Sequence, residues 1–202
     1  MVAKDRRSRV ESCVDRLVDC LIPALAGDTA LFADRPIDTS PLIASLRAEG
    51  RETGLSSADG LPVLSLLRQA LEAACHEPTP ACEIANALAA LLPALPWYQR
   101  PEPRLPDFMS GHANAIVIGP RGVASRKGAI VGVTLMAPNV EYPGHHHPPQ
   151  ELYIALSDGE WRQNDSRWQA PGLGGLVYNP PNVPHSMRAR SKPLLAIWCL
   201  WN

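Results

Sequence analysis

The sequence predicts a mostly β protein with α-helix, in which an α-helical N-terminal region (residues 1–97) packs on a C-terminal β-barrel (residues 98–202). Two observations carry this prediction. Before residue 97, apolar residues recur at the three-and-four spacing of amphipathic helices; after residue 113, the chain turns to short β-branched runs bounded by Gly, Pro, Asn and Asp. Strands this short and this regularly spaced are typical of a sandwich or a barrel.

Four helices are expected in the N-terminal region. The first covers residues 10–25, where apolar side chains fall on one face and charged ones on the other. The second begins at Ser40, an N-cap followed by proline, and stops near Gly50. The third covers residues 62–74, and the fourth opens at Thr79, which also precedes a proline.

The second half of the chain is expected to be built from strands and turns. Prolines 96, 101, 103 and 106 mark a connector that we expect to be non-helical, because an interior proline breaks a helix. Ser157-Asp158-Gly159 is a hairpin signal. The expected strands are residues 115–118, 129–136, 152–156, 159–163, 176–178, 183–190 and 194–201.

Size and charge exclude several classes of partner. The 202 residues are 46% hydrophobic and carry a net charge of −1 with mixed signs, so neither nucleic acid nor an anionic membrane is an expected partner. The first ten residues lack an apolar signal core, and the most apolar stretch, residues 85–95, is too short to span a bilayer. We expect a cytoplasmic monomer or homodimer, with five cysteines present as small, buried, reduced thiols.

Histidines are concentrated in one short stretch, residues 142–153. Side chains two or four apart in a strand point the same way, so His145, His147, Glu151 and Tyr153 can share one face if the stretch is a strand with a kink at its two prolines. His146 is expected to face the other way. A further ligand from the distant His185 requires a folded-over or closed sheet, such as a small barrel.

Imidazole and carboxylate groups suit borderline divalent ions, and three or four protein ligands leave positions open for a substrate. We therefore expect one divalent metal ion, with Zn, Fe(II), Mn, Ni and Co all fitting the ligand types. His145 is either a ligand itself or a hydrogen-bond donor to one. The competing interpretation, a solvated histidine loop, fits poorly with an internal position between strands.

The histidine pattern resembles the two motifs of the cupin superfamily. The first motif, His-x-His followed by Glu and later Gly, corresponds to His145, His147, Glu151 and Gly159. The second, a Gly followed by Pro-x-Gly-x-x-His, is matched by Gly174, Pro180 and His185, with Asn182 at the second glycine position. Asn tolerates left-handed backbone better than most other residues, so this departure is mild. The resemblance implies a cupin barrel, also called a double-stranded β-helix or jelly roll.

Within the cupins, the chain is similar to the bacterial dimethylsulfoniopropionate (DMSP) lyases of the Q and L types. Those enzymes resemble it in their helical N-terminal part and in a His-x-x-x-Glu-x-Tyr string with a later His and an upstream Tyr. The resemblance implies that His147, Glu151, Tyr153 and His185 bind the metal and that Tyr142 is the upstream phenol. It also implies a small zwitterionic sulfonium substrate, cleaved by β-elimination to dimethyl sulfide and acrylate.

That reaction needs a base and a contact for the sulfonium. A phenol near a divalent ion can serve as the base, with Tyr153 the natural candidate and Tyr142 the alternative. Trp198 and Tyr178 are expected to contact the substrate, because an aromatic face attracts an onium cation. Two other functions stay open: an Fe(II)-dependent cupin dioxygenase of a small thiol or acid, and a non-catalytic cupin that binds a metal or small molecule.

Overall fold

The computed structural model describes residues 2–27, 29–53 and 60–202, with side chains described from residue 9 onward. The helices are α1 (Val2–Leu25), α2 (Ser40–Arg47), α3 (Leu67–Ala74), α4 (Pro80–Ala89) and α5 (Pro106–Gly111), with 3-10 turns at Pro62–Leu66 and Leu92–Ala94. The strands are β1 (Arg51–Glu52), β2 (Trp97–Tyr98), β3 (His112–Ile118), β4 (Ala124–Ser125), β5 (Ile130–Met136), β6 (Glu141–His145), β7 (Gln150–Ala155), β8 (Glu160–Gln163), β9 (Leu176–Asn179), β10 (His185–Arg188) and β11 (Leu194–Trp201).

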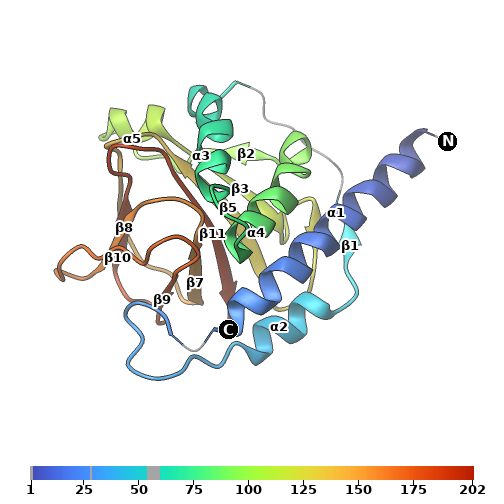
Figure 1. The fold of residues 1–202 in the computed structure, drawn as a ribbon, viewed down its shortest axis with the longest axis horizontal. Coiled ribbons are helices and arrows are strands. Elements are labelled where there is room, and N and C mark those ends of the chain that lie inside the picture. Colours follow the sequence, from blue (N-terminus) through green and yellow to red (C-terminus); the bar gives the residue numbers. More distant parts are fainter. Residues whose placement is uncertain (1, 28, 54–59) are drawn as a thin grey trace.

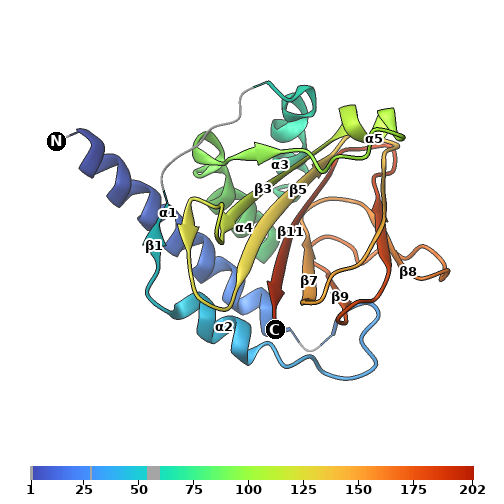
Figure 2. The same cartoon turned by 180° about the vertical axis from the view of Figure 1, so that it is seen from behind.

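Two sheets face each other to form the barrel. The larger has eight strands in the order β1-β4-β3-β5-β11-β7-β9, with β2 pairing to β3, and the smaller has three in the order β6-β10-β8. Helices α1 to α4 lie on one side of the large sheet and the small sheet lies on the other, as the two opposite views make plain (Figure 1, Figure 2). The expected architecture of helices packed on a barrel is thereby confirmed.

Successive side chains along the strands of the large sheet point to opposite faces, and this separates two hydrophobic clusters. On β11, Ile197 and Cys199 belong to a cluster shared with the helices, whereas Ala196 and Trp198 belong to a second cluster between the two sheets. Gly132 pairs with Trp198 across β5 and β11, and a Cβ at this glycine would lie 2.1 Å from the indole. The missing side chain therefore makes room for Trp198 inside the barrel.

The helices follow the apolar pattern closely. On α1, Leu17, Leu21 and Leu25 are fully buried against the outer face of the large sheet and its neighbouring helices. Thr79 caps α4 as expected, because its Oγ1 accepts the backbone N–H of Cys82 at 3.3 Å. The N-cap of α2 is Thr39, one residue before the predicted Ser40. The loop before the third helix includes residues 54–59, which lie outside the described residues.

Two local predictions were wrong. The proline connector does contain a helix, α5, because Pro106 occupies the first turn, where its missing N–H costs nothing. Ser157-Asp158-Gly159 does not close a hairpin, because β7 pairs with β11 and β9 whereas β8 pairs with β10. This turn instead carries the chain from the large sheet to the small one. The division at residue 97 stays a prediction.

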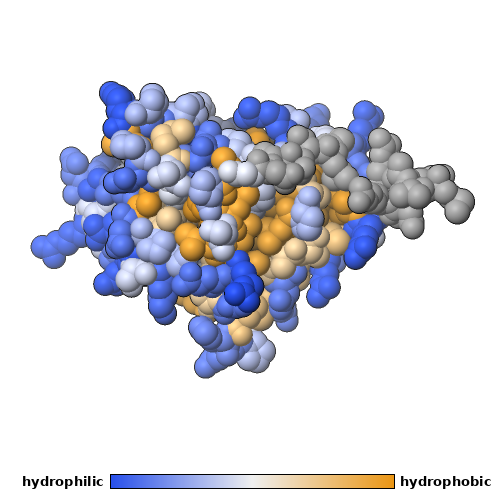
Figure 3. All heavy atoms as spheres, turned by 90° about the horizontal axis from the view of Figure 1, so that it is seen from above, coloured by the Kyte–Doolittle hydropathy of each residue, from blue (hydrophilic) through white to orange (hydrophobic). Residues whose placement is uncertain are grey.

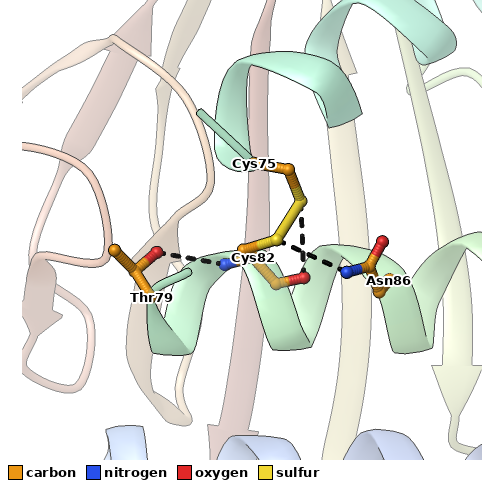
Figure 4. Close-up of a disulfide and its surroundings, with 4 residues drawn as sticks. All are labelled: Cys75, Thr79, Cys82 and Asn86. Carbon is orange, nitrogen blue, oxygen red and sulfur yellow. Dashed lines mark hydrogen bonds between the residues drawn. A yellow bond between two sulfur atoms is a disulfide. The ribbon is translucent and has the colours of Figure 1, made fainter. Parts of the chain in front are cut away.

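The cysteine prediction was wrong for one pair. Cys75, at the end of α3, and Cys82, in the first turn of α4, form a disulfide (Figure 4). The side-chain amide of Asn86 lies 3.4 Å from the Cys82 sulfur. The helical spacing of Cys75 and Cys82 in the sequence indicated that both are buried. It did not indicate that their Cβ atoms are close, because this depends on the turn between the helices. Cys13, Cys20 and Cys199 are free, and Cys199 is buried as expected.

The face seen in Figure 3 is bordered by hydrophilic side chains, with hydrophobic ones gathered nearer its centre. Among the described residues, no helix is both long and apolar enough to cross a membrane.

Candidate metal centre

The histidine-rich stretch lies where the two sheets meet. His145 ends β6, His147 follows it, and Glu151 is the second residue of β7, so the two prolines between them carry the chain from the small sheet to the large one. His185 begins β10 and is the register partner of His145. A fold-back of the barrel thus joins the two motifs, which are far apart in sequence.

The loop before His185 is tied to the first motif through its backbone. Asn182 donates its N–H to the carbonyl oxygen of His147 at 2.9 Å. Its φ is +61°, so the residue at the substituted glycine position adopts the left-handed conformation that the sequence predicted it could tolerate. Gly174, the first glycine of the same motif, has φ +74°.

Each site histidine has one ring nitrogen committed to the backbone. The Nδ1 atoms of His145, His147 and His185 lie 3.1, 2.9 and 2.9 Å from the carbonyl oxygens of Pro143, Pro149 and Val183. A carbonyl oxygen only accepts, so Nδ1 carries the proton in all three rings. In the neutral form of each ring, Nε2 then presents a lone pair, which is the form of imidazole that binds a metal.

Glu151 completes the cluster from the large sheet. Its Oε2 lies 3.4 Å from His147 Nε2 and 3.1 Å from His185 Nε2, and its side chain is 4% exposed. Burial acts to raise the pKa of Glu151, but the rings of His147 and His185 outweigh it and lower the pKa to about 2. Burial, followed by the charge of His185, lowers the pKa of His145 to about 4. Near pH 7 the site thus offers a carboxylate and a neutral His145.

These groups fit a divalent cation. Ring nitrogens of His145, His147 and His185 lie within 4.8 Å of one another. His185 Nε2 is buried without a hydrogen-bond partner, and it faces a carboxylate oxygen. Imidazole lone pairs and a carboxylate repel one another unless a cation lies between them. A proton can join only one nitrogen to the oxygen, whereas one metal ion with bonds of about 2.0–2.2 Å can satisfy all four groups.

The carboxylate is held by residues that the sequence did not reveal. Asn179 lies opposite Glu151 across β7 and β9, and its side-chain amide donates to Glu151 Oε2 at 3.0 Å. Gln163 in turn donates to Asn179 Oδ1 at 2.9 Å. Asn179 meets Glu151 through the pairing of β9 with β7, and Gln163 reaches Asn179 from β8 in the other sheet. Neither contact can be read from local pattern, so no motif marks these residues.

Both predicted tyrosines lie in the cluster between the sheets. Tyr153 is 3% exposed and Tyr142 is 7% exposed. Burial raises the pKa of Tyr142 to about 12, with Asn114 and Arg100 opposing the rise. Burial, and then the Glu151 charge, raises the pKa of Tyr153 well above its usual range. A bound cation would act against both increases.

A buried polar chain leads to the Tyr142 hydroxyl. The indole N–H of Trp198 donates to Thr134 Oγ1 at 3.1 Å, and Thr134 donates to Asn114 Oδ1 at 2.5 Å. The Asn114 amide lies 3.3 Å from the Tyr142 hydroxyl oxygen and donates to it. The chain therefore fixes the position of the phenol relative to the barrel wall.

The remaining predicted residues divide between the two faces of the strands. Trp198 lies inside the barrel, in the same cluster as Tyr142 and Tyr153. Tyr178 lies on the opposite face of β9 from Asn179, packs against the cluster shared with the helices, and donates its hydroxyl to Gln150 Oε1 at 2.9 Å. Its position gives no support to a contact with substrate. His146 is exposed, as the alternation predicted.

Comparison with known proteins identifies the family. The sequence model of the dimethylsulfoniopropionate lyases matches residues 39–196, more than half of the chain. The chain belongs to the DMSP lyase family. The match includes every proposed metal ligand, both tyrosines and most of the helical region. The family resemblance that the motifs suggested is confirmed.

Two curated members of the DMSP lyase family align with about half of this chain. The putative lyase DddL of Cereibacter sphaeroides is 33% identical over 103 residues, which are 50% of this chain and 43% of that protein. The lyase DddQ of Ruegeria pomeroyi is 30% identical over 96 residues, or 47% of each. The match thus spans less than half the length of either relative.

Solved structures described as DMSP lyases share the fold over nearly the whole chain. A structure described for the DMSP lyases RdDddP and RnDddQII has a TM-score of 0.70 at 18% identity and covers 96% of this chain and 94% of that one. DddQ of Ruegeria pomeroyi has a TM-score of 0.67 at 20% identity, with coverages of 94% and 91%. The cupin-type fold with preceding helices is confirmed.

Proposed function

We propose that the chain is a metal-dependent carbon–sulfur lyase that cleaves DMSP by β-elimination to dimethyl sulfide and acrylate. The observation that carries the proposal is the convergence of three imidazoles and Glu151 beside two buried phenols, in a member of the DMSP lyase family. His145, His147, Glu151 and His185 would hold one divalent ion, and Tyr153 is proposed as a further ligand or as the base.

The difficult step is removal of a proton next to the substrate carboxylate, because the developing enediolate carries two negative charges. A bound divalent ion would supply a Lewis acid that offsets this charge. The residues of the chain then have to orient the carboxylate, accept the proton and exclude water. Dimethyl sulfide leaves as a neutral thioether, so a single base is sufficient.

Either Tyr153 or Tyr142 can accept the proton. Tyr153 lies two residues from Glu151 on the same face of β7, whereas Tyr142 has a cation, Arg100, 5.6 Å from its ring centroid. The chain from Trp198 to Asn114 holds the Tyr142 oxygen in place. Proximity to the proposed metal supports Tyr153 as the base, and the neighbouring Arg100 supports Tyr142 as the base.

Trp198 is the proposed contact for the sulfonium. Its indole lies in the interior cluster with both tyrosines, and its N–H is already engaged by Thr134. The ring face attracts a cation by about 0.5–2 kcal/mol, and a sulfonium can use this attraction without any hydrogen bond. An apolar, aromatic wall also suits the neutral thioether that leaves.

Anaerobic incubation of the metal-loaded protein with DMSP, followed by headspace analysis, tests the proposal. We expect dimethyl sulfide and acrylate in equal amounts and no requirement for oxygen. Substrate loss that occurs only with oxygen uptake would instead identify a dioxygenase. Tight binding of DMSP without any product would identify a binding module.

Location and assembly stay proposals. We propose a monomer or homodimer that acts in the cytoplasm. The Cys75–Cys82 bridge is the observation that weighs against a reducing compartment, because disulfides rarely persist there.

A further inference from the structure

Arg100 is a half-buried cation beside the candidate metal centre, and no carboxylate pairs with it among the described residues. The acid that follows it on the same segment, Glu102, is bound by Arg104 through contacts of 2.9 and 3.3 Å. A guanidinium offers five N–H donors and is always charged. A positive group that is partly removed from water and left without a counter-ion is suited to an anionic ligand.

The position of Arg100 is fixed by its own backbone. Its N–H donates to His112 Nε2 at 2.9 Å, and the side-chain amide of the preceding Gln99 donates to the His112 carbonyl oxygen at 3.2 Å. Just before this, Tyr98 pairs with Asn114 where β2 joins β3. The segment is therefore held against the start of β3, and the guanidinium extends from a fixed point.

The guanidinium reaches the same carbonyl group as a proposed metal ligand. Arg100 Nη1 lies 3.4 Å from the Pro143 carbonyl oxygen, and His145 Nδ1 lies 3.1 Å from that same oxygen. The Tyr142 ring centroid lies 5.6 Å from the Arg100 guanidinium carbon and 5.1 Å from the His145 ring centroid. The guanidinium also hydrogen-bonds the Tyr142 side chain, so these two contacts use only part of its five N–H donors.

We propose that Arg100 binds the carboxylate of the substrate and sets the preference for substrates that carry one, an inference that rests on the proposed lyase function. The planar guanidinium fork matches a carboxylate in shape and charge. Charge balance favours the same assignment. A divalent ion bonded to the Glu151 carboxylate retains one net positive charge, whereas the enediolate formed by proton removal carries two negative charges. Arg100 supplies the second positive charge.

Calorimetric binding to the metal-loaded protein tests the assignment without turnover. The probes are propionate, which carries only the carboxylate end, and trimethylsulfonium, which carries only the cationic end. The variants are R100Q, which removes the charge, and R100K, which keeps it but loses the fork. R104Q is the matched control, because Arg104 lies on the same segment with an 86% exposed side chain paired to Glu102. Metal content is measured for every protein.

We expect R100Q to weaken propionate binding by about ten- to a hundredfold and R100K to weaken it less, because the charged hydrogen bonds to a carboxylate are lost or reduced. Trimethylsulfonium binding and metal content stay at the wild-type level, and R104Q behaves as wild type. For DMSP turnover, kcat/KM falls in the same order of variants. Equal propionate affinity in wild type and R100Q overturns the proposal, and so does an equal loss for both probes.

The two proposals fail separately. If wild type binds propionate through Arg100 but releases no dimethyl sulfide from DMSP, the carboxylate site stands and the lyase function does not. If wild type releases dimethyl sulfide and R100Q retains both its turnover and its propionate affinity, the lyase function stands and the role of Arg100 does not.

Discussion

At the residue scale, the site depends on side chains that are positioned by short-range backbone contacts. Each of the three histidines donates Nδ1–H to a carbonyl oxygen two residues away in the sequence, so its tautomer is set locally. Glu151 is different, because its donor Asn179 comes from another strand. Replacing these two kinds of support should have different effects on the metal and on turnover.

Replacing Asn179 should weaken metal binding. Asn179→Ala removes the N–H that orients Glu151 Oε2, and outer hydrogen bonds of this kind are typically worth about 10–100-fold in metal affinity. Competition against a chromophoric chelator measures the change. Asn164→Gly is the control, because Asn164 is exposed and has a φ of +49° that glycine adopts freely. Unchanged affinity in Asn179→Ala would remove Glu151 from the proposed ligand set.

Replacing each phenol should separate metal binding from catalysis. Tyr153→Phe and Tyr142→Phe should both keep the metal largely bound, while at least one loses nearly all production of dimethyl sulfide, since phenylalanine has no oxygen to accept a proton. Metal analysis and headspace assays measure the two effects. Tyr178→Phe is the control, because the Tyr178 side chain packs on the helix side of the large sheet and its hydroxyl binds Gln150. Wild-type rates in both interior variants would rule out a phenolate base.

His112 should make stability depend on pH. Its Nε2 accepts the N–H of Arg100 and its Nδ1 donates to the Phe108 carbonyl, so the folded protein needs the neutral ring. Burial lowers its pKa below the usual 6.5, with the backbone contact at Phe108 opposing the shift. The unfolded chain therefore binds this proton first as pH falls. The contribution of His112 to the free energy of unfolding is fully present above pH 6.5, and it is lost as the pH falls from 6.5 through the lower pKa of the folded state.

Thermal melts at several pH values check this dependence. Wild type and His112→Gln are compared with metal removed from both, so that loss of metal at low pH does not contribute. The difference between their melting temperatures should change as pH falls below 6.5. A difference that stays constant across this range would contradict a neutral, buried His112.

At the element scale, the two helices α3 and α4 are joined by a covalent bridge as well as by packing. The Cys75–Cys82 disulfide closes a short loop with a sequence separation of 7, and Ala74 and Ala81, the residues before each cysteine, are buried in the cluster shared with the sheet. Reduction should leave the two helices packed in the folded state. It should also remove the restriction that the bridge places on the unfolded chain.

Reducing this bridge should lower stability by roughly 2–3 kcal/mol, the loop-closure entropy expected for a loop of this size. Denaturant unfolding with and without a dithiol reductant measures the loss, and thiol counting establishes the redox state. The Cys75→Ser/Cys82→Ser double variant should show no response to reductant, while Cys13→Ser should respond as wild type does. A reductant effect of equal size in the double variant would contradict the bridge.

At the scale of the whole molecule, the candidate metal centre joins the two sheets of the barrel. His145 and His185 come from the small sheet, Glu151 from the large one, and His147 from the connection between them. A bound ion would therefore tie together segments that are otherwise held by packing and by a few hydrogen bonds between the sheets, such as Gln163 to Asn179 and Asn114 to Tyr142. Metal binding should stabilise the entire fold rather than one loop.

Metal removal should lower the melting temperature. At a free metal concentration of about 100 times Kd, binding adds about 2.7 kcal/mol to the free energy of unfolding, and a chelator removes this contribution. Calorimetric melts of loaded and stripped protein measure it. His185→Ala should lose most of the difference between the two states. Identical melting temperatures for loaded and stripped wild type would contradict a metal site in the barrel.

The sequence by itself determined the features that depend on near neighbours. Apolar spacing located α1, the Thr79-Pro80 pair located the start of α4, and the β-branched runs located most of the strands. The alternation argument grouped His145, His147 and Glu151 correctly but on one kinked strand, whereas His145 and Glu151 lie in different sheets. The left-handed Asn182 follows from the conformational preference of that residue type. In each case the energy that decides the structure acts within a few residues of the chain.

Only the tertiary structure decided which distant segments meet. Strand β7 pairs with β11 and β9 rather than with its neighbour β8, Cys75 lies against Cys82, Asn179 contacts Glu151, and Arg100 lies beside His145. These contacts follow from sheet register and from burial of whole faces, which are collective properties of the packed barrel. No short window of sequence contains that information, because the free energy that selects each pairing is shared among strands far apart in the chain.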